Sequence, residues 1–136
     1  MTPAEMAKIH VASFITPRPW SAAEIADLLS GQNTHLFNQD QGFALLRIAG
    51  PEAEILTIAV HPDMRRQHIA KTLLDKAHTF AKTANVEEVF LEVADQNHAA
   101  IALYESAGYT RQGTRKDYYT GPKGEHISAI VMSRAI

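Results

Sequence analysis

The sequence predicts an α+β fold, in which helices flank a mixed and mainly antiparallel sheet. Two helical patterns open the chain, and three β-rich runs separated by short turns fill its middle. A strand, a helix and a second strand then follow one another between residues 54 and 93, which predicts one parallel crossover. The predicted order of helices and strands is ααβββαβαββ.

The length of 136 residues fits a single domain over residues 1–136. Apolar residues make up 46% of the chain and charged residues 21%, a composition that argues against disorder. The net charge is −2, from 15 acidic and 13 basic residues, which gives no general attraction to nucleic acid or to an anionic membrane. We therefore expect neither of these as a direct partner.

The residue types and motifs that the sequence lacks argue against several kinds of site and against a membrane or secreted location. The chain has no cysteine, which excludes disulfides, thiolate zinc sites and a cysteine nucleophile. The seven histidines form no i, i+4 pair and no H-E-x-x-H motif, so we predict no metal site. No uncharged run approaches the length of a membrane span, and "MTPAEMAKIH" does not resemble a signal peptide. We expect a cytoplasmic protein.

The two N-terminal helices are predicted from helical spacing and from capping residues. Apolar residues recur at helical spacing over residues 3–14, and Pro3 suits the first helical position. After the break at "TPRPW", Ser21 begins a second helix, with Glu24 three residues later as a capping box. This helix is expected to end near Gly31.

The later strands and helices are predicted from the spacing of apolar residues, which changes between a period of two and the helical period. The predicted strands are 34–39, 42–50, 53–61, 87–93, 109–119 and 126–136, and the predicted helices are 66–84 and 98–107. The first three of these strands form an antiparallel meander because only short turns separate them.

A candidate anion site lies where the third strand leads into the long helix, in "VHPDMRRQHIAKTLL". Arg65, Arg66 and Gln67 are predicted in the first turn of that helix, where unpaired N–H groups and a partial positive charge suit an anion. The positive charge of arginine is unfavourable at the positive end of the helix dipole, unless an anion such as phosphate lies against it. The alternative is that they are solvated surface residues. The segment is not a P-loop.

Two polar residues interrupt apolar patterns. Glu92 lies in the strand "VFLEV", and Tyr104 lies in the buried stripe of "NHAAIALYESAGY", a helix that Asn97 caps. Each has an ordinary explanation, since a strand glutamate can face solvent and a core tyrosine can have its hydroxyl hydrogen-bonded. The alternative is that the two residues act together in a reaction. His61, after the third strand, is a rival base or a turn residue.

These segments together carry a resemblance. "RRQHIA" after "TIAVHPD", followed by "LEV", "NHAAIALY" and "GY", resembles the GNAT family of acetyl-CoA-dependent N-acetyltransferases. The match is close over residues 54–119 and extends over the rest in the order of elements. "LEVADQNHAAIALYESAGYTRQGTRKDYY" and "PWS" are similar to the RimI-like branch, which acetylates the N-terminal alanine of a small-subunit ribosomal protein. The resemblance implies the same transfer here, from acetyl-CoA to a ribosomal protein N-terminus.

The resemblance also implies a cofactor site. The backbone of Ile58, Ala59 and Val60 would pair with the pantetheine arm like an added strand, and Asn97 would reach that arm. The pyrophosphate would lie at the helix start, on residues Arg65, Arg66, Gln67, His68, Ile69, Ala70 and Lys71. His68 stands where the family usually has glycine, and we expect it to be accommodated in a helical first turn.

The implied chemistry is attack of an amine on a thioester. Glu92 would take the amine proton, directly or through a water, with its pKa raised by partial burial. Tyr104, a phenol with a pKa of about 10, would protonate the departing thiolate. Trp20, Tyr118 and Tyr119 would wall the acceptor groove, although the two tyrosines also fit as ordinary strand aromatics.

Two other functions remain open. One is a GNAT enzyme that acts on lysine or on a small amine, and the other is a CoA-binding module without catalysis, which His68 would fit. Ile127 and Ser128 stand where the RimI-like branch tends to carry acidic residues, and this bears on the acceptor rather than on the reaction. The presence of both Glu92 and Tyr104 favours an enzyme.

Overall fold

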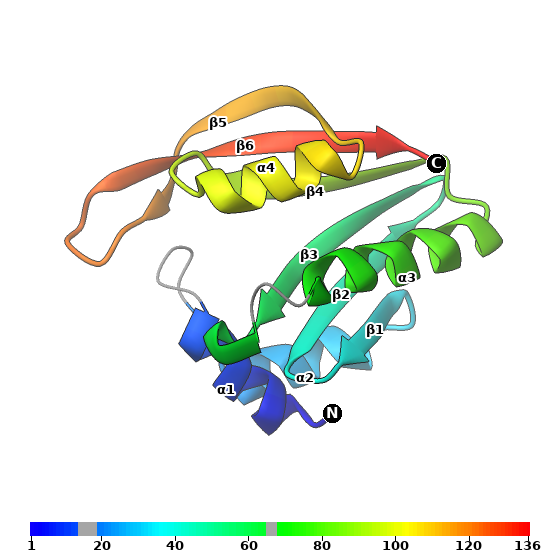
Figure 1. Ribbon diagram of the computed structural model, residues 1–136, viewed down its shortest axis with the longest axis horizontal. Coiled ribbons are helices and arrows are strands. Elements are labelled where there is room, and N and C mark those ends of the chain that lie inside the picture. Colours follow the sequence, from blue (N-terminus) through cyan, green and yellow to red (C-terminus); the bar gives the residue numbers. More distant parts are fainter. Residues whose placement is uncertain (14–18, 65–67) are drawn as a thin grey trace.

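The computed structural model describes residues 1–13, 19–64 and 68–136, which form a six-stranded sheet with helices on both faces (Figure 1). The elements are α1 (Pro3–Ser13), α2 (Ala22–Ser30), β1 (Thr34–Gln39), β2 (Gly42–Ala49), β3 (Glu52–Val60), a 3-10 turn (Pro62–Met64), α3 (Ile69–Thr83), β4 (Glu88–Ala94), α4 (His98–Ser106), β5 (Thr110–Thr120) and β6 (His126–Ala135). Their order is the predicted ααβββαβαββ. None of the described helices is long and apolar enough to cross a membrane.

The strands lie in the order β1-β2-β3-β4-β6-β5. The meander β1–β2–β3 is antiparallel, as predicted, and α3 connects β3 to the parallel strand β4. Residues on alternate sides of β2 enter two cores: Phe43 and Leu45 pack with α1 and α2, whereas Leu46 packs with α3 and β4. The sheet is therefore covered differently on its two faces.

The two parallel strands separate before they end. Their pairing runs from Glu52–Glu88 to Ile55–Leu91, whereas β3 continues to Val60 and β4 to Ala94. Figure 1 shows β3 and β4 close together near the C-terminus of the chain and apart at their own C-terminal ends. Beyond Ile55–Leu91, no β3–β4 pair is formed in the described part of the chain.

A β-bulge lies where the strands part. Leu46 opposes Ile55 and Leu45 opposes Thr57, so Leu56 is an extra residue on β3. Ile55 packs in the core beneath α3 and α4, whereas Leu56 packs on the side of α1 and α2, and Thr57 bonds to α1 on that same side. Two consecutive side chains thus share one face, directly after the last β3–β4 pair.

The start of the long helix differs from the prediction. The helix α3 begins at Ile69 rather than at residue 66, and His68 is its N-cap in the left-handed conformation, with φ 58° and ψ 23°. The expectation that His68 lies in a helical first turn was therefore wrong, because the chain enters α3 through a left-handed residue. Glycine adopts this conformation without the steric cost that a Cβ brings. Arg65, Arg66 and Gln67 lie outside the described residues.

Candidate active site

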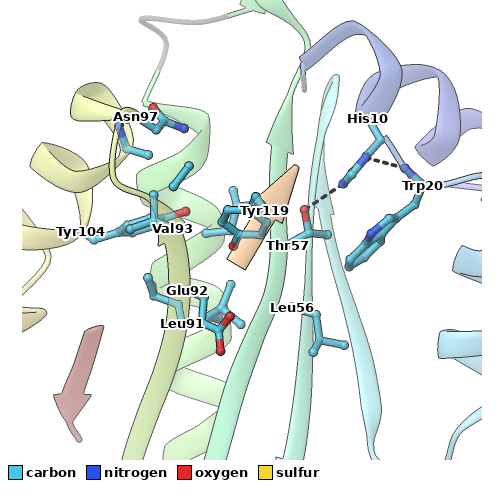
Figure 2. Close-up of a pocket in the computed structure, with 14 residues that line it drawn as sticks. His10, Trp20, Leu56, Thr57, Leu91, Glu92, Val93, Asn97, Tyr104 and Tyr119 are labelled. Carbon is cyan, nitrogen blue, oxygen red and sulfur yellow. Dashed lines mark hydrogen bonds between the residues drawn. The ribbon is translucent and has the colours of Figure 1, made fainter. Parts of the chain in front are cut away.

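A cavity of about 110 Å³ lies between the parted ends of β3 and β4. Figure 2 shows residues from α1, β3, β4 and α4 around it, together with Trp20 and Tyr119. Its lining consists of His10, Trp20, Ile55, Leu56, Thr57, Ile58, Leu91, Glu92, Val93, Ala94, Asn97, Ala100, Tyr104 and Tyr119. The structure thus brings together six of the residues predicted for the site, from five separate parts of the chain.

Glu92 lies on β4 directly after the last β3–β4 pair, and its side chain is 19% exposed. Burial raises the pKa of the Glu92 carboxyl, and the charge of Glu54 raises it further. Arg115, whose Nε lies 3.3 Å from a Glu92 oxygen, and a hydrogen bond from Tyr118 act in the opposite direction. The balance is upward, which is the predicted direction and the one that suits a proton acceptor.

Tyr104 projects from α4, and Figure 2 shows its hydroxyl directed toward the gap between β3 and β4. Burial raises its pKa to about 12, above the ordinary value that the sequence suggested. The phenol therefore stays protonated at physiological pH. Complete proton transfer to a thiolate is unfavourable, because a thiol has a pKa of about 8.5. Tyr104 is better suited to donate a hydrogen bond to developing negative charge than to give up its proton.

Asn97 is the N-cap of α4, and it lines the same cavity. Its side-chain oxygen accepts the backbone N–H of Ala100 at 3.2 Å. This bond leaves the two amide N–H donors of Asn97 available to a ligand, because an asparagine side chain has separate donor and acceptor ends.

A second hollow, of about 280 Å³, also contacts Glu92. Its lining comprises Trp20, Leu28, Glu54, Ile55, Leu56, Glu92, Tyr118 and Tyr119. The three aromatic residues predicted for the acceptor groove therefore share one hollow with the predicted base. Glu54, which the sequence did not single out, adds a second carboxylate there, so the hollow suits a cationic group between aromatic walls.

A third hollow, of about 430 Å³, lies between the start of α3 and α4, and its lining comprises Val60, Met64, His68, Ile69, Ala70, Lys71, Leu103 and Ser106. It contains the described part of the predicted pyrophosphate site, and the free amides of the first turn of α3 belong to it. Ile58 faces the first cavity instead. Ala59 is 2% exposed and packs toward α1 and α2, so only its backbone is available to a ligand.

His10 is a site residue that the sequence analysis missed. Its Nδ1 accepts the backbone N–H of Trp20 at 3.0 Å, so the neutral ring carries its proton on Nε2 and donates it to the Thr57 hydroxyl, 3.1 Å away. Its ring also stacks on Trp20, with centroids 5.0 Å apart. Burial lowers the pKa of His10 to about 4, against a smaller raising effect of Glu24. The buried His10 ring therefore connects α1 and Trp20 to the bulged part of β3.

His61, the rival base suggested by the sequence, lies in the turn that follows β3. Nδ1 of His61 accepts the backbone N–H of Asp63 at 3.2 Å in the turn after β3, and His61 does not line the three hollows above. Within residues 1–13, 19–64 and 68–136, no group of three or more histidine, cysteine, aspartate or glutamate residues is placed to hold a metal ion.

The chain is similar to known acetyltransferases. The model of the Acetyltransferase (GNAT) family matches residues 9–109. The [Ribosomal protein bS18]-alanine N-acetyltransferase of Escherichia coli K12 is 32% identical over 137 residues, which cover 96% of this chain and 90% of the relative. The enzyme of the same name from Salmonella typhimurium is 38% identical over 94 residues, 69% of this chain and 63% of the relative.

Solved structures agree with these similarities. The crystal structure of the ribosomal-protein-S18-alanine N-acetyltransferase from Escherichia coli matches with a TM-score of 0.88 and 31% identity, over 98% of this chain and 87% of that one. Arabidopsis thaliana NAA60 in complex with a bisubstrate analogue matches with a TM-score of 0.84 at 18% identity, over 100% of this chain and 94% of that one, a likeness of fold alone.

Proposed function

This chain belongs to the GNAT family of acetyl-CoA-dependent N-acetyltransferases, and on that premise we propose that its acceptor is the α-amine of a protein N-terminus. The acceptor we favour is the N-terminal alanine of a small-subunit ribosomal protein in the cytoplasm, as in the names of the relatives. The whole of residues 1–136 would serve as one catalytic domain. The observation that carries the proposal is the meeting of Glu92 and Tyr104 in one cavity, next to a second hollow with aromatic and acidic lining residues.

Acetyl-CoA would enter through the gap between β3 and β4. The backbone of β3 at Ile58, Ala59 and Val60 lies beyond the last pair with β4 and would hydrogen-bond the amides of the pantetheine arm as a further strand would. The donors of Asn97 lie at the same opening. The pyrophosphate would bind at the start of α3, where backbone amides and the helix dipole favour negative charge. The contributions of Arg65, Arg66 and Gln67 stay predictions.

The reaction would proceed by direct attack. The neutral amine forms a bond to the acetyl carbon while the carbon–sulfur bond breaks, and the proton lost by the amine passes to Glu92, directly or through a water. Negative charge accumulates on sulfur as it departs. The protonated phenol of Tyr104 would donate a hydrogen bond to that charge from its place in the cavity wall.

The acceptor preference follows from acidity and from space. A peptide α-amine has a pKa of about 8, against about 10.4 for lysine, so it needs less help to lose its proton. A carboxylate whose pKa burial raises is therefore matched to an α-amine. Trp20, Tyr118 and Tyr119 form aromatic walls around the approach to Glu92, which favours a small first side chain.

A thiol-release assay with acetyl-CoA and a peptide panel tests this function. We expect peptides that begin with alanine or serine to react faster than the same peptides with a blocked N-terminus and an internal lysine. Faster reaction of the blocked lysine peptide would move the assignment to a lysine acetyltransferase of the same family. Lack of turnover with every peptide and with polyamines would favour a CoA-binding module.

The variant Glu92→Gln tests the proposed base, because it keeps the shape of the side chain and removes the proton acceptor. We expect turnover to fall on the order of 10²–10⁴-fold, the usual contribution of general base catalysis. Acetyl-CoA affinity, measured by calorimetry, should stay nearly constant, since Glu92 is proposed to contact the amine and not the cofactor. A variant with unchanged turnover would contradict the assignment of the base.

A further inference from the structure

The proposed base already has a cation beside it. Arg115, on β5, places its Nε 3.3 Å from Oε1 of Glu92, and its guanidinium lies over the ring of Tyr118 at 5.2 Å from the centroid. The two partners differ in exposure: the Glu92 side chain is 19% exposed and that of Arg115 is 56% exposed. The carboxylate is therefore held in the wall of the site, while the guanidinium reaches it from the solvent side.

This pair occupies the position that the acceptor needs. An α-amine with a pKa of about 8 arrives mostly as an ammonium ion at neutral pH. The ammonium group is attracted to the Glu92 carboxylate, which already has Arg115 beside it. Arginine has no acceptor atom and does not lose its own proton in proteins, so Arg115 cannot act as the base.

The structure offers Arg115 another place. A hollow of about 260 Å³ is lined by both Arg115 and Glu92, and Glu52 and Glu54 contribute two further carboxylates to its lining. Glu54 is bound to Arg47 at 3.0 Å and is 40% exposed, so it remains accessible. Arg115 already lines this hollow and its side chain is 56% exposed, so solvent and these carboxylates can stabilise its charge when it leaves Glu92.

We propose that Arg115 is a positioning residue that holds Glu92 in the acceptor-free enzyme and is displaced from it by the ammonium group of the incoming acceptor. The inference rests on the proposed function, since it takes Glu92 as the base and an amine as the acceptor. No covalent step is added: one cation replaces another at the same carboxylate. The ammonium gives its first proton to solvent, and the neutral amine gives its second proton to Glu92 as it attacks.

The groups that face Glu92 set the direction of the expected effect. They are Arg115, Tyr118 and Tyr119 from β5, Glu54 from β3 and Tyr104 from α4, while His10 of α1 lies across the cavity in its neutral form. Arg115 is the cation of this group and lowers the pKa of Glu92. Its removal should raise that pKa and free the carboxylate for the acceptor.

The test compares Arg115→Gln with the control Arg111→Gln in steady-state kinetics with an alanine-initiated peptide over a range of pH. Arg111 lies on the same strand, is 58% exposed and has Glu105 at 3.9 Å, so it matches Arg115 in strand, exposure and an acidic neighbour but lies outside the site. For Arg115→Gln we expect the acidic limb of kcat/KM to move to higher pH. Above that limb, KM for the peptide should be about two- to fivefold lower, the scale of an exposed ion pair. Arg115→Lys should restore part of both changes.

A second measurement does not depend on turnover. The Arg115 Nε–Hε NMR signal of the wild-type protein with CoA should shift when an alanine-initiated peptide is added, and it should not shift with the N-acetylated peptide. Kinetics of Arg115→Gln identical to those of Arg111→Gln, or an Nε–Hε signal that ignores the free amine, would overturn the exchange. Failure of the proposed function looks different, because wild-type enzyme would then turn over no peptide or Glu92→Gln would leave turnover unchanged.

Discussion

At the scale of single residues, His68 shows how backbone geometry can matter more than side-chain chemistry. It adopts the left-handed conformation at the N-cap of α3, and its side chain makes no capping hydrogen bond. A residue with a Cβ loses roughly 1–2 kcal/mol in this conformation. The sequence showed a histidine in place of a glycine but not the φ value, because the pattern alone placed the helix start too early.

We expect His68→Gly to raise the free energy of unfolding by up to about 1 kcal/mol, because relief of the left-handed strain exceeds the added chain entropy of glycine in the unfolded state. Urea denaturation measures this, and calorimetry should show acetyl-CoA affinity equal or tighter. His68→Ala is the control, since it removes the imidazole and keeps the Cβ, so it should not gain stability. Equal loss of cofactor affinity in both variants would show instead that the imidazole contacts the cofactor.

At the scale of elements, local patterns were predictable and long-range contacts were not. The capping box of α2 was predicted because Ser21 and Glu24 are neighbours in sequence, and the structure shows both of its hydrogen bonds. The bulge at Leu56 was not predicted, because an apolar run reads the same whether or not one residue is added to the strand. The pairs His10–Thr57 and Glu92–Arg115 join elements far apart in sequence, which no local period reveals.

The packing of α3 on the sheet depends on Gly42 of β2. A Cβ at this position would lie 2.8 Å from Ile69, the first residue of α3, and 3.2 Å from Val60 at the end of β3. The absent side chain therefore allows the start of the helix to approach the sheet. Since Val60 and Ile69 both line the proposed cofactor hollow, this contact also sets the shape of that site.

We expect Gly42→Ala to lower the free energy of unfolding by about 1–3 kcal/mol, the range for overpacking a filled core. Acetyl-CoA affinity should fall as well, because the start of α3 must move. Gly113→Ala is the control, since nothing lies within 4 Å of a Cβ there. Denaturation measures the stability of the two variants, and calorimetry measures their acetyl-CoA affinity. Equal stability and affinity in both would show that the sheet accommodates the methyl group without moving α3.

At the scale of the whole molecule, two buried histidines hold separate parts of the fold together in their neutral forms. His10 joins α1 and Trp20 to β3. His78 of α3 accepts a hydrogen bond from Arg134 at Nδ1, at 3.0 Å, and therefore donates from Nε2 to the Tyr109 hydroxyl, 2.6 Å away. Burial is the main cause that lowers the pKa of each to about 4, with Arg134 adding to the effect at His78. Protonation of either ring would convert an acceptor nitrogen into a donor that faces another donor.

This arrangement predicts a loss of stability in mild acid. Between pH 6.5, the ordinary pKa of histidine, and the folded value of about 4, the unfolded chain binds protons at His10 and His78 that the folded protein does not. Stability from these rings is therefore fully present above pH 6.5 and falls below it, by at most about 1.4 kcal/mol per pH unit for each ring. Glu92 acts in the opposite direction, because folding raises its pKa.

Urea denaturation from pH 7.5 to pH 4.5 should show this fall in the free energy of unfolding. The variant His78→Gln removes one titrating ring, so it should reduce the slope of stability against pH by about half of the two-ring value. A slope unchanged by His78→Gln would place the acid sensitivity elsewhere in the molecule.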